Sequence, residues 1–313
     1  MRKILTVLVI AGVTAVSGSA WAKPKAQCNP KDKVTSNCSA IWKAIGLPAY
    51  TGTAAGKTAV CHDRYVTSND NASKTPDWVV ELLTKAKLTN RYSRPPVDFT
   101  PDPCVPDDGS PDSGDYEKTA DKFAKGHMAP SEDFNNSLVN MRDTFYFSNA
   151  VPQIGTKFNG SVWKTLETEV RKAAVARNTL YMMSGPVRGD GVHRTIEIAK
   201  ADNACGGAIE LDAVKTAIVC KAVNKKQATT CSTGVVVPVA LYKIAYDPKA
   251  NAAYAFVMPN RAYPGGQGRD YLEEWRVNVG VIERLTGLKF FPDLPPEKRA
   301  SLIDKCEPTT LWP

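Results

Sequence analysis

Three histidines occur in the chain, and one of them lies in a setting suited to proton transfer. His127 stands between Gly126 and the run Met128-Ala129-Pro130, so a glycine can free the backbone before the imidazole and a proline closes the turn. A neutral imidazole is available near pH 7 to act as a general base. His62 follows a cysteine at a predicted strand and is expected to be structural, and His193 is expected at the surface. His127 is the candidate base, although one Gly-His pair is weak evidence by itself.

A second group of residues recurs every four positions further along the chain: Asn159, Trp163, Glu167 and Arg171. Residues four apart are neighbours on one face of a helix. An amide oxygen and a carboxylate are hard ligands that suit Mg²⁺, and a guanidinium suits phosphate. The alternative is an ordinary amphipathic helix with a Glu–Arg pair at its surface, which the spacing alone favours.

The periodicity of apolar residues predicts the elements that position these groups. Helical spacing is seen over 77–87, 161–177 and 270–286, the last ended by Gly287, and strands are expected at 60–66, 144–148, 180–184, 235–246 and 253–258. A long acidic loop covers 93–115. This order predicts an α+β fold with a central, mostly antiparallel sheet flanked by helices.

The N-terminus and the cysteines predict an exported protein. Arg2 and Lys3 precede an apolar run and Ala20-Trp21-Ala22, which together indicate a signal peptide over 1–22 and a periplasmic or secreted protein. Residues 23–313 are expected to form a single domain, with an irregular arm at 23–57 and an insertion at 200–234. The eight cysteines predict disulfides, at least one of them inside the insertion.

The charge balance favours an anionic partner. The formal net charge is +8, which is compatible with nucleic acid or an acidic surface. No stretch after the N-terminal run approaches the length of a membrane span, so we expect no membrane interaction.

Several ordered blocks together resemble secreted bacterial members of the sugar-nonspecific DNA/RNA endonuclease family. The blocks are GHMAPSEDF (126–134), TFYFSNAVPQ (144–153) and FNGSVWKTLETEVR (158–171), and the likeness extends over most of 60–295. The resemblance implies a ββα-metal (His-Me) finger at the active site. It also implies hydrolysis of DNA and RNA without marked sequence specificity, through contacts to the backbone phosphates, leaving 5′-phosphate ends.

The resemblance implies a role for each matching residue. His127 is similar to the family's general base, and Asn159 to the sole direct protein ligand of Mg²⁺, for which Mn²⁺ is a possible substitute. Glu167 resembles the carboxylate that holds a metal-bound water. Arg171, and less closely Arg94, resemble cations that bind phosphate.

One block departs from the family pattern. Ala124-Lys125 replaces the usual Asp-Arg before Gly-His, so Lys125 keeps a positive charge but loses the bidentate fork. This leaves two alternatives to a nonspecific nuclease: a nucleic-acid-binding homologue with weakened catalysis, and a phosphodiesterase for small phosphoesters. The second would not need the excess positive charge.

Overall fold

The centre of the structure, a computed structural model, is a seven-stranded sheet in which all neighbouring strands are antiparallel. The structure describes residues 36–89, 92–117, 123–188, 196–198, 203–206, 209–211, 234–306 and 311–312. Across the sheet the strands are β12 (Arg276–Val277), β11 (Ala252–Pro259), β10 (Ala240–Asp247), β7 (Thr179–Val187), β4 (Thr75–Thr84), β3 (Tyr65–Asp70) and β2 (Lys57–Cys61). The predicted α+β fold with a mostly antiparallel sheet is confirmed.

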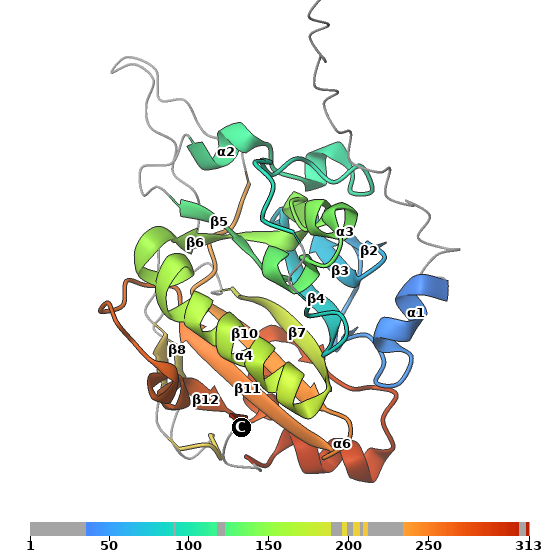
Figure 1. The fold of residues 1–313 in the computed structure, drawn as a ribbon, viewed down its shortest axis with the longest axis vertical. Helices are drawn as coiled ribbons and strands as arrows, with labels where there is room; N and C mark the ends of the chain where they lie inside the picture. The colour runs from blue at the N-terminus through green and yellow to red at the C-terminus, as the bar shows by residue number, and fades with distance from the viewer. Residues whose placement is uncertain are drawn as a thin grey trace, which may run out of the picture.

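Both faces of the sheet are covered. Successive side chains of a strand point to opposite faces, yet every residue of β10 and β11 is buried. On one face Lys243 meets the ring of Trp163, and on the other Tyr242 packs against Phe290 at 5.6 Å between ring centroids. Figure 1 shows α4 (Lys164–Arg177) lying across the strands of the first face.

The remaining elements are short and lie around the sheet. The helices are α1 (Ser36–Trp42), α2 (Ser113–Glu117), α3 (Leu138–Asp143), α5 (Val279–Thr286) and α6 (Pro296–Ile303). Two-stranded pairs are formed by β1 (Ala49–Tyr50) with β13 (Leu288–Lys289), and by β8 (Ile196–Ile198) with β9 (Ile209–Leu211). None of the described helices is long and apolar enough to cross a membrane.

A separate strand pair leads into α4. Strand β5 (Phe123–His127) is antiparallel to β6 (Ala150–Ile154), and the chain then passes through a wide helical turn, Gly155–Trp163, into the helix. In Figure 1 this pair lies near the N-terminal end of α4. Two strands and a helix in this order form the ββα unit that the resemblance predicts.

Two predicted elements are wrong. Residues 77–87 were expected to be helical, but 77–84 belong to β4, a central strand that is buried along most of its length. A strand buried on both faces shows a continuous apolar run, which resembles a helix face. Residues 144–148 form no strand, because Tyr146 makes only an isolated bridge to Thr100 and a 3₁₀ turn, Phe147–Asn149, follows. In this segment Phe145 packs against His127, whereas Tyr146 stacks on His62.

Two other predictions are partly wrong. The arm at 23–57 contains α1 and β1, because Ile41 and Ile45 join the core and a disulfide ties Cys38 to Cys61. The helix at 270–286 is three pieces, a 3₁₀ turn, β12 and α5, because Arg276 pairs with β11. Its predicted end is confirmed, since Gly287 caps α5 with φ 66°.

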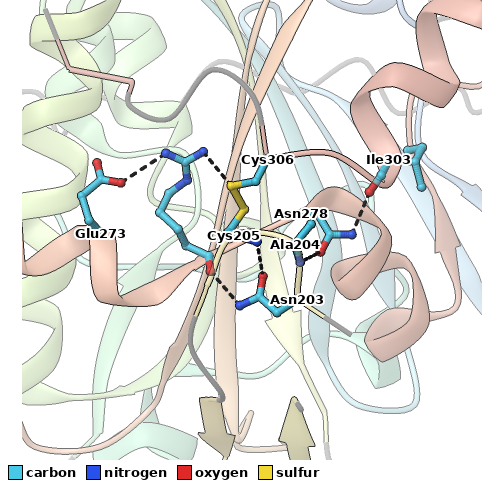
Figure 2. Close-up of a disulfide and its surroundings, with 8 residues drawn as sticks. Asn203, Ala204, Cys205, Glu273, Asn278, Ile303 and Cys306 are labelled. Atoms are coloured by element: carbon cyan, nitrogen blue, oxygen red, sulfur yellow. Dashed lines mark hydrogen bonds and ion pairs between the residues drawn. A yellow bond between two sulfur atoms is a disulfide. The ribbon is translucent and has the colours of Figure 1, made fainter. Parts of the chain in front are cut away.

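The disulfides connect distant parts of the chain. Cys205 pairs with Cys306 near the C-terminus, and Cys104 is also disulfide-bonded. Figure 2 shows the surroundings of the Cys205–Cys306 bridge, where Arg276 donates a hydrogen bond to the Cys306 sulfur at 3.4 Å. Residues 1–22, His193 and the 212–233 part of the insertion lie outside the described residues. The predicted bridge inside the insertion therefore stays a prediction.

Candidate active site

His127 is the last residue of β5 and lies opposite Ala150 of β6. Its ring packs between two phenylalanines, with centroid distances of 4.6 Å to Phe99 and 4.8 Å to Phe145. Phe99 comes from the long loop at 93–115, which therefore folds onto the site. The imidazole is held by aromatic packing from two segments that are far apart in sequence.

Gly126 provides space rather than backbone freedom. The residue is in a strand and is not among the glycines with positive φ, in contrast to the expectation of a special backbone conformation. A Cβ at this position would lie 2.1 Å from the side chain of Gln153, which is fully buried in β6. The absence of a side chain at Gly126 leaves the space that the Gln153 side chain occupies against β5.

The turn after His127 is fixed by one asparagine. The Met128 and Ala129 amides donate to the main-chain and side-chain oxygens of Asn149, each at 2.9 Å, and the Asn149 amide donates back to the Ala129 carbonyl at 2.9 Å. Asn149 is completely buried. The sequence analysis did not identify it, although it lies in the block 144–153.

Two predicted cations lie on the aromatic rings around His127. The Arg94 guanidinium is 4.8 Å from the centroid of Phe145, and the Lys125 ammonium is 5.9 Å from that of Phe147. Arg94 is exposed and Lys125 is partly exposed, so both can meet a phosphate in solvent. The structure brings both residues to the side of His127.

Asn159 lies in the wide turn before α4. The backbone kinks at Ser161 (φ −126°, ψ −108°), so Asn159 and Glu167 do not share one continuous helix as the four-residue spacing predicts. Buried Phe158 and Trp163 flank the asparagine in sequence and anchor the turn. The Asn159 side chain is partly exposed and forms no hydrogen bond within the described part of the chain.

Arg171 forms its ion pair with a buried acidic residue and not with Glu167. Arg171 forms an ion pair with Asp133 at 2.8 Å and donates to the Thr168 hydroxyl at 3.2 Å. The simple alternative of a Glu–Arg pair is therefore not what the helix forms. Desolvation raises the pKa of Glu167 to about 7, although Lys243 and Arg171 oppose the change.

Further charged groups lie below this site, and the sequence analysis missed them. Asp133, Glu81 and Lys243 are 2–3% exposed. Burial raises the pKa of Asp133 against the pull of Arg171, and it raises the pKa of Glu81 well above its usual range. A lysine in the middle of the apolar strand 239–246 is a signal that could have identified Lys243.

His62 has a structural environment, as the sequence predicts. It is buried, bonds to Asp102 at 2.8 Å and stacks on Tyr65 and Tyr146. Burial disfavours the charged form of Asp102, but His62 lowers the pKa of this carboxyl. The pair ties the loop at 93–115 to the sheet.

The residues fit a hard divalent cation bound with few protein ligands. Within the described residues no group of three or more His, Cys, Asp or Glu side chains could enclose a metal. Asn159 offers an amide oxygen without a competing hydrogen bond, and Glu167 a nearby carboxylate on the next helix. Mg²⁺ usually keeps several waters and takes only one or two protein ligands.

Comparisons with known proteins agree with this geometry. The profile of the DNA/RNA non-specific endonuclease family matches residues 47–297. The mitochondrial nuclease EXOG of Danio rerio is 30% identical over 97% of this chain and 81% of its own length. The Homo sapiens EXOG is 30% identical over 82% of this chain, which spans 61% of that protein, and the Saccharomyces cerevisiae mitochondrial nuclease is 26% identical over 77% and 67%.

A solved structure shows the same fold. A crystal structure of the EndoG/EndoGI complex, which describes the inhibition of EndoG, superposes with a TM-score of 0.65. It covers 84% of this chain and 95% of its own chain at 24% identity. The predicted fold with a ββα-metal finger is confirmed.

The comparisons correct the predicted location. The relatives named above are mitochondrial nucleases, and this finding contradicts the predicted periplasmic or secreted protein of bacterial type. A basic start followed by an apolar run does not by itself specify one compartment, since several kinds of targeting segment begin with basic residues.

The match of the family profile to most of the chain agrees with the ββα arrangement around His127. The chain belongs to the DNA/RNA non-specific endonuclease family.

Proposed function

We propose that this chain is a Mg²⁺-dependent endonuclease that hydrolyses phosphodiester bonds of DNA and RNA without marked sequence specificity, leaving 5′-phosphate ends. The proposal depends on one observation above all. His127 ends β5 of a ββα unit. The helix of this unit, α4, carries Glu167 in its first turn, and Asn159 lies in the wide turn that leads into α4. Base, metal ligand and carboxylate thus come from one compact unit.

His127 is the general base in this proposal. Its imidazole accepts the proton of the attacking water, and packing against Phe99 and Phe145 keeps the ring in one orientation. Asn159 would hold Mg²⁺ as the sole direct protein ligand, and the Glu167 carboxylate would orient water at this site. When bound, Mg²⁺ polarises the phosphoryl oxygen and stabilises the departing 3′ oxygen.

Arginine and lysine side chains hold the phosphate. Arg94 and Lys125 lie on the histidine side, and Arg171 lies on the helix side, where Asp133 fixes the guanidinium. Cations at these positions stabilise the negative charge that grows on phosphorus oxygens during attack. A surface hollow beside the start of α4 is lined by Gly160, Ser161, Lys164, Thr165, Thr168, Glu169, Gly266 and Gln267. In this proposal the sugar-phosphate backbone next to the cleaved phosphate runs through this hollow along α4.

The test is plasmid nicking with Mg²⁺, with Mn²⁺ and with EDTA, combined with a metal-binding titration. We expect cleavage of DNA and RNA with either metal and none with EDTA. Asn159→Ala should lose both metal affinity and cleavage at every pH, whereas Thr156→Ala, an exposed change in the same turn, should behave as the parent. A folded Asn159→Ala protein that binds Mg²⁺ and cuts at the parental rate would refute the metal assignment.

The same assay separates the remaining alternatives. A homologue with weakened catalysis binds DNA without turnover, and the replacement of Asp-Arg by Ala124-Lys125 is the feature that favours it. A phosphodiesterase for small substrates cleaves a model phosphodiester but leaves plasmid intact.

A further inference from the structure

A buried lysine lies directly beneath the proposed site. Lys243 is in the middle of β10 and only 2% exposed, and its neighbours on the strand, Tyr242 and Ile244, are fully buried. Its ammonium group donates to the Ser184 hydroxyl at 2.7 Å and to the Met128 carbonyl at 3.4 Å. It also lies 5.1 Å from the centroid of the Trp163 ring.

These three contacts come from different parts of the ββα unit and the sheet. Met128 follows His127 directly, so the ammonium holds the chain at the end of β5. Trp163 is the last residue of the turn that contains Asn159 and leads into α4. Ser184 is the cross-strand neighbour of Lys243 in β7, so it fixes the ammonium from the sheet. One side chain therefore touches both halves of the unit.

Lys243 is also a positive charge shared by several carboxylates. Burial raises the pKa of Glu81 on β4, of Asp133 before α3 and of Glu167 on α4, and the charge of Lys243 opposes each rise. Other charges in this region are Arg171 and Arg64, together with Glu132. Glu81 and Val79 are two residues apart in β4, so their side chains point to the same face of the sheet. Val79 is opposite Ser184, which is opposite Lys243, so Glu81 shares this face with Lys243.

Stability alone gives a weak reason for this lysine. Removing an ammonium from water is costly, and an apolar residue of similar volume often serves a core as well or better. The other residues of β10 on this face are Leu241, Ala245 and, at the end of the strand, Asp247, whose charge is paired with Arg177 of α4. A role in the site explains the lysine better than packing does.

We propose that Lys243 is a positioning residue of the nuclease site, whose ammonium fixes the end of β5 at His127 relative to the turn and helix that carry Asn159 and Glu167. The expected effect on kcat rests on the proposed function, whereas the placement of His127 by Lys243 does not. The ammonium does not touch the substrate.

The test compares Lys243→Met with the parent and with Ile244→Val. Methionine keeps an unbranched side chain that is one atom shorter and removes the charge. Ile244→Val perturbs the same strand on its opposite face and controls for lost stability. We expect kcat of Lys243→Met to fall about a hundredfold, as for a misplaced catalytic group, with KM and DNA affinity nearly unchanged. Ile244→Val should keep the parental kcat.

A second readout needs no activity. The imidazole C–H signals of His127 in an NMR spectrum depend on the rings of Phe99 and Phe145, and there are only three histidines to assign. We expect Lys243→Met to shift the His127 signals and to leave those of His62 unchanged.

The outcomes are distinct. A folded Lys243→Met protein with parental kcat and an unmoved His127 signal overturns the proposal. If the parent shows no nuclease activity, the proposed function fails, and the NMR signal alone decides the positioning role. If Lys243→Met does not fold, Ser184→Ala removes only the hydroxyl that accepts from the ammonium. Its kcat should fall about threefold to tenfold, the effect of one lost hydrogen bond, and an unchanged kcat and His127 signal overturn the proposal.

Discussion

Glu167 should reduce the stability of the metal-free protein, and replacing it should stabilise the fold. Desolvation raises the pKa of its carboxyl from 4.5 to about 7. Because the folded-state pKa lies above the unfolded one, the fold favours the protonated carboxyl. The contribution of the protonated Glu167 carboxyl to the free energy of unfolding is fully present below about pH 4.5 and is lost as the pH rises through about 7. Glu167→Gln keeps the shape of the side chain and removes this dependence.

The size of the effect follows from the difference between the two pKa values. At 1.36 kcal/mol per pKa unit, the loss approaches about 3 kcal/mol once the pH is well above 7. At pH 5 most of it has not yet occurred. The advantage of Glu167→Gln over the parent should therefore grow by about 2 to 3 kcal/mol between pH 5 and pH 8.

The assay is urea unfolding of both proteins in EDTA at pH 5 and at pH 8, monitored by circular dichroism. Glu169→Gln is the matched control, since Glu169 lies on the same helix but pairs with the exposed Lys172. Its stability difference from the parent should change little with pH. An advantage of Glu167→Gln that stays constant or shrinks as the pH rises contradicts the reasoning. The nuclease activity of Glu167→Gln should be lower than that of the parent, because the variant lacks the carboxylate.

Three further variants test other parts of the site. His127→Ala should lose about a hundredfold to ten-thousandfold in kcat, keep its affinity for DNA and Mg²⁺, and regain part of its rate at high pH, where hydroxide replaces the base; loss of DNA binding in a folded protein would count against this role. Gly126→Ala should cost about 1 to 3 kcal/mol in chemical unfolding, because the new Cβ meets the buried Gln153 at 2.1 Å. Adding Gln153→Ala should recover part of that cost, and equal stability of Gly126→Ala and the parent would show that the strand can relax. Arg94→Ala should weaken binding similarly for unrelated DNA sequences and reduce the slope of log Kd against log salt by about 1; an unchanged slope would mean that Arg94 does not contact phosphate.

The chemistry of the site could be predicted from short stretches of sequence. His127, Asn159, Glu167 and Arg171 occur in two blocks, and the resemblance of these blocks to the family implies a base, a hard ligand and a phosphate-binding cation. Residues close in sequence remain close in the folded ββα unit. The wide turn and its kink at Ser161 were not predicted, because four-residue spacing is the same for a straight helix and for an interrupted one.

Secondary structure was less predictable where the core decides it. The run at 77–84 has the apolar content of a helix, but pairing with β3 and β7 on both sides makes it a central strand. The piece at 276–277 leaves a helical pattern to pair with β11, and Arg276 lies over the rings of Tyr254 and Phe256. In both places contacts with distant strands outweigh local propensity.

The sequence by itself determined the family, the α+β class and the candidate site residues, because these depend on motifs that are local in the chain. Only the tertiary structure decided what lies beneath them. Lys243 is about eighty residues beyond Trp163 in the chain, yet its ammonium lies over the Trp163 ring. Glu81 is about fifty residues before Asp133, yet the charge of Asp133 helps to raise the pKa of Glu81. The free-energy cost of a buried charge depends on its neighbours in space, and these neighbours cannot be inferred from spacing along the chain.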